Sequence, residues 1–235
     1  MGKHVIGING CRGGWLICRI DVATVAVDLI AAVRHLSEVL EREDSAIKIA
    51  IDIPIGLPEI GCARRCDLQA RKLLTSLRGS SVFPAPPREL ITKLDYSETN
   101  RYAMSICGKG VSKQAHAIFP RIAEVDGIMT PDLQERLFEV HPELCFWGLA
   151  GRPMQYGKKK SDGYEERREV LSRVLANDVP ARSEVRRLEL PIEPDDVLDA
   201  LAAGYSAYRA YTGDARRIPD LPEVDRKGLR MEMVY

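Results

Sequence analysis

Four polar residues stand where predicted elements of this chain begin or end. Asn9 closes one short apolar segment, and Asp52 closes another in the stretch AIDIPIGLP. Asp196 and Asp199 lie three residues apart in DDVLDALAAGY, a spacing that predicts a shared helical face. Carboxylates that gather repel one another unless a cation lies among them, and hard oxygen ligands suit Mg²⁺ or Mn²⁺. We therefore predict a divalent-metal site of Asn9, Asp52, Asp196 and Asp199, in which the three aspartates are also catalytic.

Each aspartate also has a plain structural interpretation. Asp52 precedes Ile53 and Pro54 and could cap a turn. Asp196 could be a favourable charge at the positive end of a helix. Asp199 lies among apolar residues, where an unpaired carboxylate is costly, so the functional interpretation is favoured for this residue.

A second group of candidate residues lies in the stretch FEVHPE. Glu139 and His141 alternate with apolar residues, so both are predicted on one face of a strand. Glu139 is predicted to be a further catalytic acid and metal ligand, and His141 and Glu143 are predicted to contact the substrate. His141 alone could be a metal ligand, a general base or a core histidine bonded to backbone.

Basic side chains that could bind phosphate gather in two stretches. One is KKK at 158–160 together with Arg167 and Arg168, and the other consists of arginines between 64 and 78. The alternative for each is an ordinary solvated face. The residues assigned to phosphate or substrate binding are Arg12, Lys113, Lys159 and Arg167.

Apolar runs and helical periodicity predict the elements that position these residues. Two short connections in a row indicate antiparallel hairpins, and a helix between the third and fourth strands indicates a parallel pair, so the sheet is mixed. A largely helical insertion over about 57–135 is expected to cap the sheet, and the charged tail after Gly213 is expected at the surface. The predicted strands are 3–9, 15–20, 25–30, 47–53 and 137–141, and the predicted helices are 32–43, 63–77, 110–125, 164–177 and 194–212.

Bulk composition bounds the class of protein. The chain has 235 residues, 45% of them hydrophobic, which is enough for a single domain spanning the whole chain. The 34 basic residues balance 34 acidic ones, which argues against an indiscriminate nucleic-acid binder but leaves room for a local basic groove. No stretch approaches the ~20 apolar residues that cross a bilayer, and the start does not resemble a signal peptide, so a cytoplasmic protein without membrane contact is expected. The oligomeric state is not indicated.

The chain resembles the DUF429 family of predicted ribonuclease-H-like nucleases. The resemblance lies in GINGCRGGW, AIDIPIGLP, RRCDLQARKLL, SSVFPAPPR, GKGVSKQAHAIFPRI, FEVHPELCFWGLAGRP, KKKSDGYEERREVL and DDVLDALAAGYSA. It implies an α/β ribonuclease-H-like fold, with a mixed five-stranded sheet flanked by helices and a more distant similarity to RuvC-type resolvases. It places site residues at Asn9, Asp52, Asp196 and Asp199. The family usually has aspartate where this chain has Asn9, and an amide supplies an oxygen without a charge.

Three functions follow as hypotheses. The first is a Mg²⁺- or Mn²⁺-dependent nuclease that hydrolyses phosphodiester bonds of a nucleic acid. The second is a nucleotide-binding or phosphotransfer protein of the actin-like superfamily, in which the glycines between Gly7 and Gly14 cradle phosphate, although such kinases need two sheet units and only one is predicted. The third is a catalytically degenerate binding protein, marked by Asn9.

Overall fold

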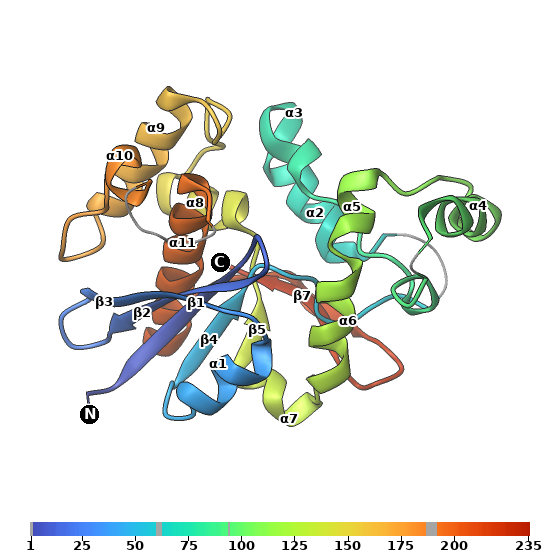
Figure 1. Ribbon diagram of the computed structural model, residues 1–235, viewed down its shortest axis with the longest axis horizontal. Helices are drawn as coiled ribbons and strands as arrows, with labels where there is room; N and C mark the ends of the chain where they lie inside the picture. Colours follow the sequence, from blue (N-terminus) through green and yellow to red (C-terminus); the bar gives the residue numbers. More distant parts are fainter. Residues whose placement is uncertain (1, 60–62, 94, 187–191) are drawn as a thin grey trace.

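The centre of the protein is a five-stranded mixed sheet of order β3-β2-β1-β4-β5 (Figure 1). The computed structural model describes residues 2–59, 63–93, 95–186 and 192–235. β2 runs antiparallel to β1 and β3, whereas β4 is parallel to both β1 and β5. The predicted α/β class and mixed five-stranded sheet flanked by helices are confirmed. The strands are β1 (His4–Cys11), β2 (Gly14–Asp21), β3 (Val27–Val33), β4 (Lys48–Ile51) and β5 (Leu137–Glu139).

The helix between β3 and β4 begins later than predicted. Helix α1 covers Leu36–Arg42, whereas the sequence predicted a helix from residue 32. Ala32 and Val33 instead pair with Leu16 and Trp15 of β2. The pairing with β2 therefore overrides the local helical preference of this alanine-containing stretch.

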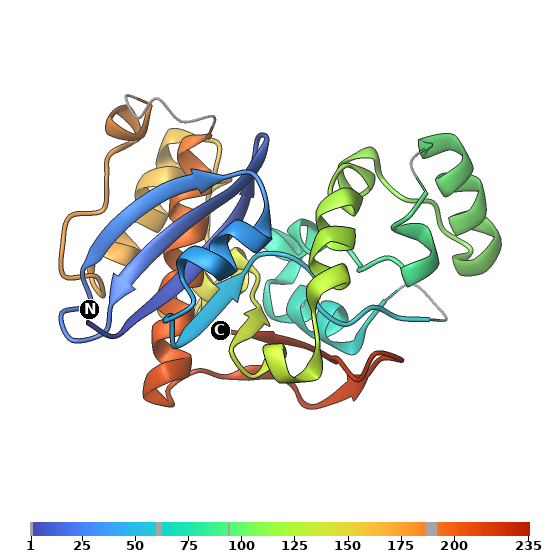
Figure 2. The ribbon, with the colours of Figure 1, turned by 60° about the horizontal axis from the view of Figure 1, so that its bottom comes forward.

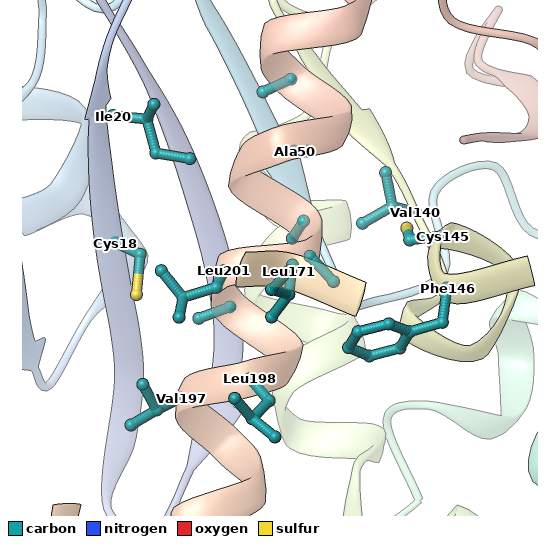
Figure 3. Packing of buried hydrophobic residues seen from close by; sticks show 14 of the residues in the cluster. Cys18, Ile20, Ala50, Val140, Cys145, Phe146, Leu171, Val197, Leu198 and Leu201 are labelled. Carbon is teal, nitrogen blue, oxygen red and sulfur yellow. The ribbon is translucent and has the colours of Figure 1, made fainter. Parts of the chain in front are cut away.

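Alternate residues of each central strand fill two separate cores, as expected for a sheet covered on both faces. Val5 points to a core that includes residues of α8 (Pro142–Ala150), α9 (Ser161–Ser172) and α11 (Pro194–Thr212). Ile6 points to the opposite core, which includes residues of α1 and α6. Figure 3 shows the first core, where Val197 and Leu201 of α11 face side chains of β2.

Helix α11 crosses β1 at close range, and two glycines allow this approach. A Cβ atom added to Gly7 would lie 2.1 Å from the Ala200 carbonyl oxygen and 2.1 Å from the Gly204 nitrogen. Only hydrogen at Gly7 lets the strand and the helix touch, because a Cβ contact below 3.0 Å forces backbone apart, and a Cβ at Gly204 would lie 3.3 Å from the Gly7 nitrogen. This contact sets the distance between the end of β1 and the first turns of α11.

Gly7→Ala is expected to lower the free energy of unfolding by roughly 3 kcal/mol, because the added methyl must push α11 away from the sheet. Thermal or urea unfolding of the purified variant measures the effect. Gly127→Ala is the matched control, because its Cβ would meet nothing within 4 Å and alanine favours the exposed helix. Equal stability of the two variants would contradict the close-approach argument.

The segment between β4 and β5 is largely helical and lies beside the sheet (Figure 2). Both predicted helices are present, but each is split. Thr75 has a positive φ of 54° between α2 and α3, and Pro120 begins a new helix after α5. Helix α4 was not predicted. The segment contains α2 (Arg65–Leu73), α3 (Thr75–Arg78), η1 (Gly79–Ser81), η2 (Arg88–Leu90), α4 (Tyr96–Cys107), α5 (Lys113–Ala117), α6 (Phe119–Ile128) and α7 (Pro131–Gln134).

The prediction of a surface excursion after Gly213 holds for most of residues 214–228, which are exposed, but not for the last residues, which are buried. The tail forms a two-stranded antiparallel sheet, β6 (Arg217–Val224) and β7 (Arg230–Val234). Met233 and Tyr235 are buried in a third apolar cluster with α2 residues, including Cys66. The charged residues of the tail, such as Glu232, made these strands look exposed in the sequence, although Glu232 is buried. The remaining helix, α10 (Arg182–Val185), precedes residues 187–191, which lie outside the described part of the chain.

The described residues include no helix long and apolar enough to cross a membrane. Cys66 is buried and carries a free thiol. Cys62 falls outside the described residues.

Candidate functional site

The sheet brings Asn9 and Asp52 side by side. Ile8 of β1 pairs with Ile51 of β4, and the Asp52 amide donates to the Ile8 carbonyl at 2.9 Å. The two polar residues therefore leave the sheet together at the carboxyl ends of parallel strands. Open α/β sheets place their ligands at this edge. Asn9 and Asp52 are therefore neighbours because β1 and β4 pair in parallel with Ile8 opposite Ile51.

Helix α11 brings its first turns to the same edge. The Asp196 Oδ2 atom accepts the Glu193 amide at 2.9 Å, which completes a capping box at the helix start. The Asp196 Oδ1 atom accepts the Asn9 side-chain amide at 3.3 Å. Asp196 is therefore both a helix-capping residue and the direct neighbour of Asn9.

A cavity of about 440 Å³ opens at this edge and holds most of the candidate residues. Asp52 and Asp199 line it together with Lys158, Lys159 and Arg121. A second cavity of about 670 Å³ is lined by residues of the β1–β2 turn, including Arg12, and by Asp196. The acidic candidates therefore line two cavities, each with basic side chains in its wall.

The carboxylates lie close enough to perturb one another. Burial, and then the charge of Asp199, raise the pKa of Asp52 to about 7. Burial raises the pKa of Asp196 to about 6, and the charges of Asp195 and Asp199 add to this shift. Asp52, Asp196 and Asp199 therefore occupy one electrostatic neighbourhood, although nearly 150 residues separate the first from the last. Perturbed acids in a cavity are typical of functional sites.

The cation in this acidic cluster is the Lys158 ammonium. Its Nζ atom lies 2.5 Å from Asp199 Oδ2 and 3.5 Å from Asp195 Oδ2. These partners, Asp199 first, raise the pKa of Lys158, and Lys158 in turn opposes the pKa rise of Asp52. The sequence had marked Lys158 only as part of a basic run. The predicted metal site contained several carboxylates and no basic residue, and this imbalance could have indicated that a nearby lysine pairs with them.

The cluster suits a hard divalent cation in its donor chemistry. Within the described part of the chain, however, no three His, Cys, Asp or Glu side chains are grouped as a metal site, and the Lys158 ammonium lies beside Asp199. A further carboxylate oxygen that could bind a metal ion lies nearby. Glu143 Oε2 is buried without a hydrogen-bond partner among the described residues, and Glu143 lines the same cavity.

His141 and Glu143 lie in the cavity wall, as expected for substrate-contacting residues, but Arg167 does not. The Arg167 side chain is 0% exposed and pairs with Glu143 Oε1. It also donates to the carbonyls of Tyr156 and Gly163, at 3.0 and 2.7 Å. The Arg167 guanidinium is buried and binds the protein's own loop, so in this structure it does not reach the cavity where a substrate contact was predicted.

Glu139 is also held by an arginine. Arg64 donates to both Glu139 oxygens, at 2.6 and 2.7 Å, and to Asp67 at 2.7 Å. All three side chains are almost fully buried. The Ile55 amide donates to Glu139 as well, at 2.6 Å, which ties down the loop that follows Asp52. Glu139 therefore positions this loop, and its predicted catalytic and metal-binding role stays a prediction.

The remaining basic candidates fall in different places. Lys159 is exposed and lines the first cavity, and Arg12 is exposed and lines the second. Lys113 is exposed, and its ammonium lies 5.9 Å from the centre of the Tyr96 ring, outside both cavity walls. Arg121 was not predicted, yet it lines the first cavity and donates to the Cys11 carbonyl at the end of β1.

These features define an α/β protein with an acidic cluster at the carboxyl edge of a mixed sheet. The profile of a family described as "Protein of unknown function (DUF429)" matches residues 7–224. The chain therefore belongs to the DUF429 family, as the sequence resemblance indicated.

Two solved structures are similar to this chain at low identity. One is described as Thermus thermophilus RuvC in complex with a Holliday junction substrate. It has 14% sequence identity and a TM-score of 0.36, and the match covers 90% of this chain and 97% of that chain. The other is Thermus thermophilus RuvC, with 13% identity, a TM-score of 0.36, and coverage of 90% and 98%. No functionally curated protein shows significant similarity to the chain.

Proposed function

We propose that this protein is a divalent-metal-dependent hydrolase of phosphodiester bonds in a nucleic acid. The observation that carries the proposal is the shared cavity of Asp52 and Asp199, which also contains Lys158 and Lys159. Carboxylates that hold a cation, next to ammonium groups that hold a phosphate, are the combination that phosphodiester hydrolysis needs.

The roles divide between the two walls of the cavity. Asp52 and Asp199 would hold Mg²⁺ or Mn²⁺, with Asp196 and Asn9 at the edge of the site. A divalent ion bound there would supply a water of lowered pKa and neutralise charge on the phosphate. The exposed Lys159 would bind a phosphate oxygen, because ammonium groups at a cavity rim meet an anion without a large desolvation cost. Hydrolysis would join the water oxygen to phosphorus and break the bond to the leaving oxygen, and the leaving oxygen would take up a proton from solvent in exchange for the one that the water releases.

Cleavage assays on the full chain test this proposal. Labelled single-stranded, duplex, hybrid and branched nucleic acids are incubated with the protein in Mg²⁺ or Mn²⁺. The expected result is cleavage of at least one substrate, with complete loss when a chelator removes the metal. Absence of cleavage with every substrate and both metals would count against the hydrolase.

A further inference from the structure

Lys158 is a cation held directly over a buried carboxylate. The Asp199 side chain is 2% exposed, whereas the Lys158 side chain is 38% exposed. The ammonium therefore covers Asp199 from the solvent side. Asp195, whose side chain is 9% exposed, lies 3.5 Å from the same nitrogen and adds a second negative charge.

The backbone that carries Lys158 is anchored. Glu166 accepts the amides of Gln155 and Tyr156, at 2.8 and 3.1 Å. Arg167 donates to the Tyr156 carbonyl from its buried position. Because these contacts hold the residues just before Lys158, its side chain can leave Asp199 by rotamer changes while the loop stays in place.

A second carboxylate in the same cavity has an open oxygen. Glu143 is 6% exposed, Arg167 pairs with its Oε1 atom, and its Oε2 atom is buried without a partner among the described residues. A buried carboxylate oxygen is costly to leave without a partner. The cavity therefore contains a carboxylate oxygen, Glu143 Oε2, that could bind a cation and that Lys158 does not contact.

We propose that the Lys158 ammonium is a tethered counter-ion that a divalent cation displaces from Asp199, and that the released ammonium then binds the substrate phosphate. The inference rests on the proposed function, since it takes Asp199 as a ligand of that cation. A divalent ion and an ammonium group cannot share one carboxylate oxygen without strong repulsion. An incoming phosphate removes the conflict, because it gives the displaced ammonium a new anionic partner.

Mn²⁺ binding to the full chain, without any nucleic acid, tests the displacement. The free Mn²⁺ signal in electron paramagnetic resonance gives the dissociation constant. Lys158→Met is expected to bind Mn²⁺ at least ~10-fold more tightly than the wild type, because the competing cation is gone. Lys158→Arg keeps the charge and is expected to stay within about 3-fold of the wild type.

Lys159→Met is the matched control. It removes one positive charge from the same cavity, but within the described residues no ion pair joins Lys159 to Asp199. Its gain in Mn²⁺ affinity is expected to stay below about 3-fold, as screened electrostatics at longer range predict. Lys158→Gln replaces the methionine variant if the latter does not fold, as judged by circular dichroism.

The outcomes separate the displacement from the hydrolase. Equal Mn²⁺ affinity of Lys158→Met and Lys159→Met would overturn the displacement, and Lys158 would then be a structural ion pair only. Tighter Mn²⁺ binding by Lys158→Met, in a protein that cleaves no nucleic acid, would support the displacement and argue against the hydrolase.

Discussion

Asp52→Asn is expected to lower phosphodiester cleavage by roughly 100-fold or more, because it removes a full charge from the proposed metal-binding wall. Asparagine keeps the shape and one oxygen of the side chain, so the loss would come from charge and not from packing. The rate of cleavage at saturating Mg²⁺, on whichever substrate the wild type cleaves, measures the effect. A cleavage rate of Asp52→Asn equal to that of the wild type would show that Asp52 has no role in the reaction.

The same substitution is expected to leave the protein folded and to stabilise it at alkaline pH. The folded-state pKa of Asp52 is about 7, above its ordinary value of 3.8, so the folded protein holds this proton more tightly than the unfolded chain. The unfolding free energy of the metal-free wild type therefore falls as pH rises from about 4 to 7, by at most ~1.4 kcal/mol per pH unit for this group.

The amide introduced by Asp52→Asn does not titrate, so the stability of this variant should depend less on pH across this window. Urea unfolding at pH 5 and pH 8 in the presence of a chelator checks the sign. Asp220→Asn, at an exposed position of β6, is the control and should follow the wild type. A variant that loses cleavage together with stability at pH 8 would indicate a structural role for Asp52.

Arg64→Met is expected to destabilise the fold by about 3–5 kcal/mol. The arginine is the shared partner of Glu139 and Asp67, and its removal leaves two buried carboxylates facing each other. Its Nη1 atom also donates to the carbonyls of Ile55 and Gly56, at 3.0 and 3.2 Å, so the loop after Asp52 would lose its anchor. Urea unfolding at neutral pH measures the loss.

Arg65→Met is the matched control, because the neighbouring arginine is exposed at the start of the same helix. Its effect should stay within about 0.5 kcal/mol. The double variant Arg64→Met/Glu139→Gln should recover part of the lost stability, since one of the two unpaired charges is gone. A loss for Arg64→Met no larger than that for Arg65→Met would show that the buried pairs contribute little.

The positions of the acidic residues at element ends followed from local patterns. The apolar runs that end at Asn9 and Asp52 form β1 and β4, and the periodicity of DDVLDALAAGY forms α11 with Asp196 and Asp199 in its first turns. These patterns are local, because a strand or a helix is defined by neighbours a few residues apart. They were therefore readable without knowledge of the contacts.

Some local patterns were misinterpreted at positions where contacts with distant residues determine the secondary structure. Ala32 pairs with β2 and does not begin a helix, and the charged tail folds back as β6 and β7 onto α2. Strand pairing of this kind gains stability from residues far along the chain, so local propensity alone does not predict it.

The sequence by itself determined which carboxylates reach the edge of the sheet, and only the tertiary structure decided which of them are already paired with a cation. Glu139 pairs with Arg64, Glu143 with Arg167, and Asp199 with Lys158. The physical reason is that an ion pair depends on the direction and reach of two side chains from separate elements. Among these pairs, Lys158 is the partner with substantial exposure, and it is therefore the cation that can leave.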